Sequence, residues 1–231
     1  AYLAAPGSAY RRLRLVMDAW CALWFWPLTT NVTPPSLDEW LSALEGLLGK
    51  QVKDAKGTDG TLVDASSWAE LETMEEVELG LAGARKVQSV VDEHEWLTVV
   101  QEVAEAQGFF HWELDFATVF ARGGFDLQVG NPPWVRPDVS FETLLADGDP
   151  WWMLTKKPSL EERLPHTLAC PGVLTTVLDG AAETEVLAEF ISDHSVYPIM
   201  EGRPDLYRAF MCQVWEHQKQ RGISSLIHME T

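Results

Sequence analysis

The sequence predicts an α/β chain that is mostly helical by content and carries two parallel strands in its later part. Residues 1–107 read as a series of helices bounded by capping residues, prolines and glycines. Phe125–Val129 is a short apolar run between glycines, as expected for a buried parallel strand. A second apolar run, Ile223–His228, follows a long helical connection, which a parallel pair of strands requires. We therefore expect a helical region over residues 1–107 and a partial α/β core over residues 108–231.

The first helices are defined by their start and stop signals. A helix over Tyr10–Trp26 should end before Pro27, because proline lacks the amide hydrogen that a helix needs. Ser36 and Glu39 have the spacing of a capping box, which starts an amphipathic helix that runs to Gly49.

The rest of the helical region contains a loop and two more helices. Residues 51–64 are rich in Lys, Asp and Gly and read as an exposed loop. A second capping box, Ser67 with Glu70, opens an acidic helix. A further helix is expected over Arg85–Ala106.

The later part of the chain alternates between turns and helices. A short turn of helix is expected near Val119, and Trp151-Trp152 lies in a loop. Helices are expected over Glu183–His194 and Pro204–Gln220, and Gly222 closes the second of them before the last strand.

The composition narrows the class of protein. The 231 residues carry a formal net charge of −18, and 46% are hydrophobic, enough for a core in one or two domains. The richest apolar stretch, Ala19–Leu28, is too short to span a bilayer. Cys21, Cys170 and Cys212 are far apart, and no histidine has a second ligand at a metal-binding spacing. We expect a reduced, cytoplasmic protein with no membrane role and no metal site.

Strong acidity argues against a chain that holds DNA by its phosphates, because such affinity comes from Lys and Arg displacing counterions. It does not exclude a catalytic pocket. A protein with this charge that acts on DNA should take its basic surface from elsewhere.

The four residues Asn131-Pro132-Pro133-Trp134 directly follow the first predicted strand, where ligands bind in open α/β sheets. They suit methyl transfer to a planar amino nitrogen, whose lone pair is delocalised into its ring. The Asn131 amide oxygen and the Pro132 carbonyl could both accept hydrogen bonds from such an amine and localise its lone pair. The two prolines fix φ near −65° and remove competing N–H donors. A proline-rich turn without function is the alternative.

Trp134 offers a flat face to the same pocket. A base pulled out of a duplex loses its stacking, and an aromatic ring returns about 1–3 kcal/mol of it. We therefore predict Asn131, Pro132, Pro133 and Trp134 as the catalytic group.

The chain resembles the adenine-specific DNA methylases of restriction-modification and phage-defence systems, the gamma-class amino-methyltransferases that include type IIG enzymes. The resemblance covers about residue 109 to the end and, more weakly, Tyr10–Leu28. The segments that carry it are Phe110–Phe116, Gly124–Asp126, Gly130–Trp134, Asp205–Phe210 and Leu226–His228.

This resemblance implies a helical insertion joined to part of a Rossmann-like methyltransferase sheet, with S-adenosylmethionine as methyl donor and a flipped adenine as acceptor. It also implies that Asn131 and the Pro132 carbonyl hold the amine and that Trp134 stacks on the base. One departure concerns the donor. The family binds it at a glycine-rich turn after its first strand, and no such turn precedes Asn131, so the cofactor-binding residues are unknown.

The missing donor site and the absence of an initiator Met lead us to expect an internal piece of a longer methylase. DNA would then be bound through the full-length protein, and this piece alone would be inactive. If the last strand lies beside the first, Glu230 falls next to Asn131 at the pocket edge, with plain solvent exposure as its alternative.

Two other functions fit the same residues. Methylation of a protein glutamine amide uses the same planar-nitrogen chemistry and the same motif. A non-catalytic acidic module could instead bind a basic partner or imitate DNA.

Overall fold

The computed structural model describes residues 5, 7–49, 73, 76, 77, 79–154, 157–200 and 202–227, with the side chains of 157–160 excepted. The chain forms two compact units. The first comprises Ala1–Trp26 with Asn31–Asp115, and the second comprises Pro27–Thr30 with Phe116–Thr231. The helical insertion expected over residues 1–107 stays a prediction, because compactness alone does not test an insertion.

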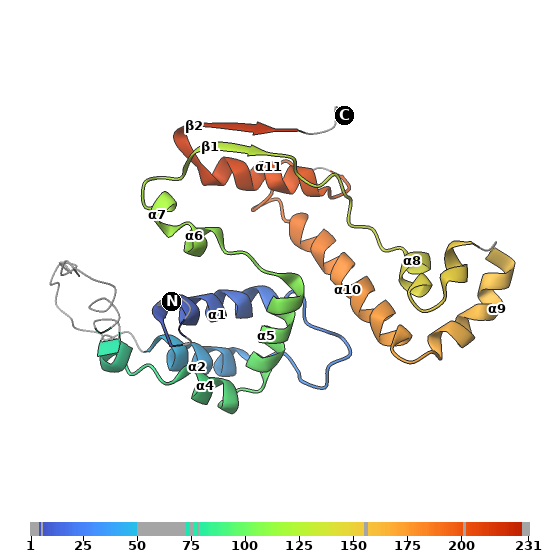
Figure 1. The fold of residues 1–231 in the computed structure, drawn as a ribbon, viewed down its shortest axis with the longest axis horizontal. Coiled ribbons are helices and arrows are strands. Elements are labelled where there is room, and N and C mark those ends of the chain that lie inside the picture. The colour runs from blue at the N-terminus through green and yellow to red at the C-terminus, as the bar shows by residue number, and fades with distance from the viewer. Residues whose placement is uncertain are drawn as a thin grey trace. The chain divides into compact units, whose positions relative to one another are not determined.

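The regular structure in the described part of the first unit consists of helices (Figure 1). Its helices are α1 (Ala9–Ala22), α2 (Leu37–Leu48), α4 (Val87–Glu93), α5 (Trp96–Gln107) and α6 (Trp112–Asp115). The capping box predicted at Ser36 and Glu39 is confirmed, since each side chain bonds the other residue's backbone N–H. The loop predicted over residues 51–64 and the capping box at Ser67 lie outside the described residues.

The single helix predicted over Arg85–Ala106 is wrong, because the chain breaks between α4 and α5. Val91 and Trp96 are both buried. In one continuous helix their side chains would point about 140° apart. The break lets both face the same core, so packing overrides the local helical preference there.

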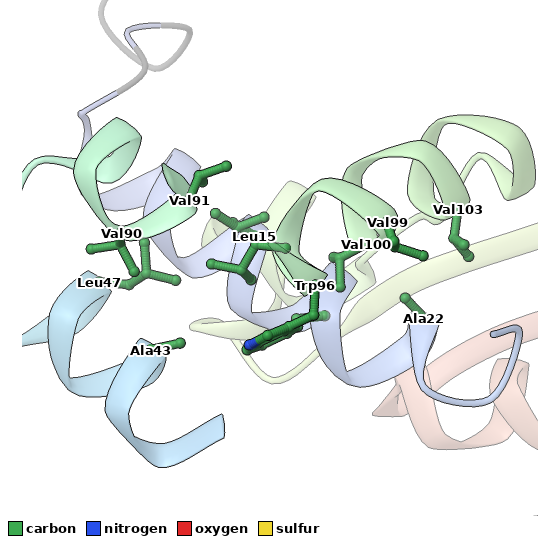
Figure 2. Close-up of a cluster of buried hydrophobic side chains, with 12 residues drawn as sticks. Leu15, Ala22, Ala43, Leu47, Val90, Val91, Trp96, Val99, Val100 and Val103 are labelled. Atoms are coloured by element: carbon green, nitrogen blue, oxygen red, sulfur yellow. The ribbon is translucent and has the colours of Figure 1, made fainter. Parts of the chain in front are cut away.

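A single apolar cluster holds this unit together, with side chains from α1, α2, α4 and α5 (Figure 2). Its members are Leu15, Ala19, Ala22, Ala43, Leu47, Val90, Val91, Trp96, Leu97, Val99, Val100 and Val103. One cation, Arg12, is buried beside this cluster. Its guanidinium donates to the carbonyl oxygens of Leu47 at 2.8 Å, Arg85 at 2.7 Å and Gly7 at 2.9 Å. It therefore caps the end of α2 in place of water.

Polar contacts attach the segment around α6 to α1. Tyr10 donates to Asp115 at 2.6 Å, and the ring of buried His111 lies 2.7 Å from the carboxylate of Asp18. Arg14 donates to the carbonyl of Phe109 at 3.0 Å. Residues 110–115, which carry part of the resemblance, therefore have a structural role in the first unit, where they attach to α1.

The second unit contains both strands, and they are parallel, as predicted. The expectation that the first strand is buried is wrong, since Leu127 is 62% and Val129 is 75% exposed. Its elements are α7 (Ala117–Phe120), β1 (Phe125–Gly130), α8 (Phe141–Ala146), η2 (Pro150–Met153), α9 (Lys157–Leu168), α10 (Val173–Ile191), α11 (Leu206–His217) and β2 (Gln218–Leu226). In Figure 1, α11 runs along the two strands, and it contacts β2. The amide of Gln128 fixes this packing by donating to the α11 carbonyl of Val214 at 2.8 Å.

Gly124 and Gly222 allow the backbones of the two strands to approach closely at the start of their pairing. Phe125 pairs with Gln218 but Leu127 pairs with Ile223, so β2 bulges over residues 219–222. A Cβ on Gly124 would collide with the His217 carbonyl, and a Cβ on Gly222 would lie 2.6 Å from the Phe125 carbonyl oxygen. Close backbone approach explains why α11 ends at His217 and not at the predicted Gln220.

Between the strands, the helices differ from the predicted ones, and Trp151-Trp152, predicted to lie in a loop, belongs to the short helix η2. The helix predicted over Glu183–His194 begins ten residues earlier, at Val173, and ends at Ile191. Two small apolar clusters stabilise this part. One contains Leu145, Val173 and Val177, and the other contains Ile191, Tyr197, Met200, Ala209 and Cys212.

Two negative findings concern only the described part of the chain. None of its helices is both long and apolar enough to cross a membrane. Its His, Cys, Asp and Glu side chains form no group that could hold a metal ion.

Candidate functional site

The predicted group Asn131–Trp134 begins where the two strands end together. Gly130, the last residue of β1, pairs with Leu226, the last residue of β2. The Gly130 carbonyl then accepts a hydrogen bond from the Ile227 N–H at 3.1 Å. The carboxyl ends of both parallel strands therefore support the first residue of the group, which is where α/β sheets bind their ligands.

The two predicted acceptors are not engaged within the described residues. Asn131 is exposed, and no hydrogen bond to its side-chain amide occurs in that part of the structure. The carbonyl of Pro132 likewise has no hydrogen bond in that part of the structure, and Pro132 as a whole is buried. Burial of Pro132 restricts the backbone at this point, while the side chain of Asn131 lies on an exposed residue.

One hydrogen bond at the edge of its indole ring orients Trp134. Its indole Nε1 donates to the Ile227 carbonyl oxygen at 3.3 Å, and 47% of the residue remains exposed. A hydrogen bond at the ring edge limits rotation of the ring and leaves its faces available for stacking. The predicted role of Trp134 needs such a face.

The segment after Trp134 is attached to the start of α11. The Val135 carbonyl accepts from the Leu206 N–H at 3.0 Å, and Arg136 Nε lies 3.1 Å from Asp205 Oδ2. Asp205 is buried, whereas 59% of the Arg136 side chain is exposed. This pair could not be predicted from the sequence, because 69 residues separate its members. Asp205 lies in the segment Asp205–Phe210, which carries part of the resemblance, but no signal within that segment pairs it with Arg136.

Glu230, predicted at the pocket edge, lies outside the described residues. The described chain also contains hollows away from Asn131–Trp134. In the first unit, a cavity of about 430 Å³ is lined by residues of α1, α4 and α5, including Arg11, Arg14 and Glu105. In the second unit, a cavity of about 290 Å³ lies at the start of α10 beside Cys170. Neither cavity includes a predicted site residue.

Comparison with known proteins identifies a family. The model described as Eco57I restriction-modification methylase matches residues 27–150, which is more than half of the chain. The match contains Asn131–Trp134. It also contains residues 29–108, which the predicted resemblance had left out. No curated protein and no solved structure matches the chain.

Proposed function

The chain belongs to the Eco57I restriction-modification methylase family, and we propose that it supplies the amine-binding side of the active site of an adenine-specific DNA methyltransferase. The methylase activity follows from the family. Adenine as the acceptor, its flipped state, S-adenosylmethionine as the donor and DNA as the partner are the finer parts of the proposal.

The observation that carries the proposal is the position, at the end of β1, of two acceptors that have no hydrogen bond among the described residues. The Asn131 side chain and the Pro132 carbonyl are adjacent in sequence and lie beside the paired ends of β1 and β2. An exocyclic amine has two N–H donors, and two fixed acceptors can satisfy both. Because the charge on the nitrogen becomes more positive as the new bond forms, acceptors held in place stabilise the transition state more than the ground state.

Trp134 has a separate role in this proposal. Its edge is bonded to Ile227, so a flipped base can stack on a ring that is already oriented. Pre-orientation lowers the entropy lost on binding. Stacking is tolerant of the identity of the base, so the requirement for an exocyclic amine rests on the two acceptors.

The described residues do not fit a donor site of the kind that the resemblance implies. That site is a glycine-rich turn after a strand, whereas Gly123 and Gly124 form the turn before β1, with φ of 91° and 106°. They lie at the amino end of the strand, opposite to the end that carries Asn131. We therefore assign no described residue to S-adenosylmethionine.

Methyl transfer by the natural protein that contains this chain tests the proposal. The protein is incubated with radioactive S-adenosylmethionine and unmethylated genomic DNA, the DNA is digested to nucleosides, and the labelled nucleoside is identified. We expect the label in N6-methyladenine. A parallel reaction with glutamine-containing peptides tests the amide alternative. Label in peptides alone, or in cytosine, would contradict the proposal.

A further inference from the structure

We propose that Arg136 and Asp205 are positioning residues for methyl transfer, and this inference rests on the function proposed above. We use the term loop anchor for two contacts together, the ion pair of Arg136 with Asp205 and the hydrogen bond from Leu206 N–H to the Val135 carbonyl. The loop anchor holds the downstream end of Asn131–Trp134 in register with β1 and β2.

The loop anchor joins consecutive residues on both sides. Val135 and Arg136 directly follow Trp134, and Asp205 and Leu206 begin α11. The two contacts measure 3.0 Å and 3.1 Å. Two adjacent contacts fix both the position and the direction of the chain at residues 135 and 136, whereas a single hydrogen bond would fix the position alone.

The α11 side of the loop anchor is rigid. Asp205 is 3% exposed, and its Oδ1 accepts from the Tyr207 N–H at 3.3 Å as the N-cap of α11. The N–H of Asp205 donates to the sulfur of Met200 at 3.4 Å, and Met200 belongs to a buried apolar cluster. Contacts with α11 and with the apolar cluster therefore hold the carboxylate of Asp205 in place, independently of its ion pair with Arg136.

The four-residue group needs this support because it has little of its own. It lies outside helices and strands, and Pro132 and Pro133 have no N–H to donate. Its upstream end is fixed by the bond between Gly130 and Ile227. Without the loop anchor, the Trp134 indole bond is the one hydrogen bond among the described residues that holds the other end. A displacement of about 1 Å at reacting atoms can cost about 10²-fold in rate.

Arg136 is exposed enough to meet a DNA phosphate, and this is the main competing explanation for any effect of Arg136→Ala. Asp205 separates the two explanations, since a carboxylate that is 3% exposed does not contact DNA. A phosphate contact predicts weaker DNA binding from Arg136→Ala and no effect from Asp205→Asn. The loop anchor predicts the same kinetic loss from both.

The experiment compares Arg136→Ala, Arg136→Lys, Asp205→Asn and the double variant Arg136→Ala/Asp205→Asn in the natural protein. Asn at position 205 keeps the N-cap acceptor, so α11 is retained. Arg163→Ala is the matched control, because it breaks another Arg–Asp pair of the second unit, with Asp149 at 2.6 Å. The readouts are kcat and KM for DNA, and the ¹⁹F resonance of Trp134 in protein labelled with 5-fluorotryptophan, assigned with Trp134→Phe.

We expect Arg136→Ala and Asp205→Asn each to lower kcat at least about tenfold with KM for DNA unchanged. The double variant should be no slower than either single variant, because both remove one ion pair. Arg136→Lys should recover part of the loss. The Trp134 resonance should shift or broaden in the three slow variants and stay in place in Arg163→Ala.

Two results would overturn the loop anchor. One is a Trp134 resonance that is unchanged in Arg136→Ala and Asp205→Asn. The other is a loss confined to Arg136→Ala and to KM, which would make Arg136 a DNA contact. If the unaltered protein transfers no methyl group to DNA, the proposed function fails, and the resonance still decides whether the loop anchor positions Trp134.

Discussion

The indole nitrogen of Trp134 lies 3.3 Å from the carbonyl oxygen of Ile227 and donates a hydrogen bond to it. Ile227 directly follows β2, and its N–H is bonded to the end of β1. The orientation of the proposed stacking ring therefore depends on the pairing of the two strands. The proposed site is a property of the sheet, and the four-residue motif alone does not create it.

Substitution of Trp134 should separate stacking from orientation. Trp134→Phe keeps an aromatic face but loses the bond to Ile227, so we expect flipped-base binding to be retained and weakened by about 1 kcal/mol. Trp134→Ala should lose about 1–3 kcal/mol of stacking in addition. Fluorescence of 2-aminopurine at the target adenine measures base flipping directly. Equal signals from the two variants would make Trp134 a packing residue only.

Asn131 should be essential for the chemical step and unimportant for stability. Its side chain has no hydrogen bond among the described residues, so Asn131→Ala should leave the melting temperature unchanged. Loss of one pre-organised acceptor should lower kcat by about 10²-fold or more. Single-turnover methylation of DNA by the natural protein measures this rate. Near-normal turnover would remove Asn131 from the site.

Gly124 and Gly123 offer a matched test of the strand junction. Both have positive φ, but a Cβ on Gly124 would collide with the backbone of His217, whereas the atom nearest to a Cβ on Gly123 is at 4.0 Å, in the side chain of Lys219. Gly123→Ala should cost about 1 kcal/mol of unfolding free energy from backbone strain. Gly124→Ala should cost clearly more, since β1 and β2 must separate. Urea unfolding monitored by circular dichroism compares them, and equal losses would contradict the close approach.

Arg12 should be a structural residue of the first unit. Arg12→Met leaves the carbonyls of Gly7, Leu47 and Arg85 without its donors, and we expect a loss of at least about 2 kcal/mol in unfolding free energy. Arg11 on the same helix is exposed, so Arg11→Met is the control and should change stability little. Chemical denaturation measures both, and similar midpoints would refute the capping role.

The ion pair between Asp149 and Arg163 should stabilise the protein less at acidic pH than at neutral pH. The hydrogen bond from the Arg163 side chain, aided by the Trp151 backbone N–H, holds the pKa of Asp149 below its usual range. A lowered folded pKa stabilises the protein above the unfolded value of about 4, and this contribution is lost as pH falls through the folded pKa. Carbon NMR of the carboxyl group should show the pKa of Asp149 rising in Arg163→Ala. An unchanged titration would mean that the pair does not persist in solution.

Local signals in the sequence were sufficient for the elements that depend on neighbours along the chain. The capping box of Ser36 and Glu39 acts across three residues, and the helix that it predicts is present. The apolar run between glycines predicts β1, and its length and flanks need no distant contact to be recognised. The parallel pairing of the last strand also followed, because a long helical connection permits it.

By itself, then, the sequence determined that Asn131–Trp134 follows a strand and that a second, parallel strand exists. Only the tertiary structure decided the break before Trp96, the end of α11 at His217 and the contacts that orient the four-residue group. Trp134 and Ile227 are 93 residues apart, and Arg136 and Asp205 are 69 apart. Such contacts form because folding brings the end of β2 and the start of α11 to the end of β1. No periodicity or spacing within a segment encodes that meeting.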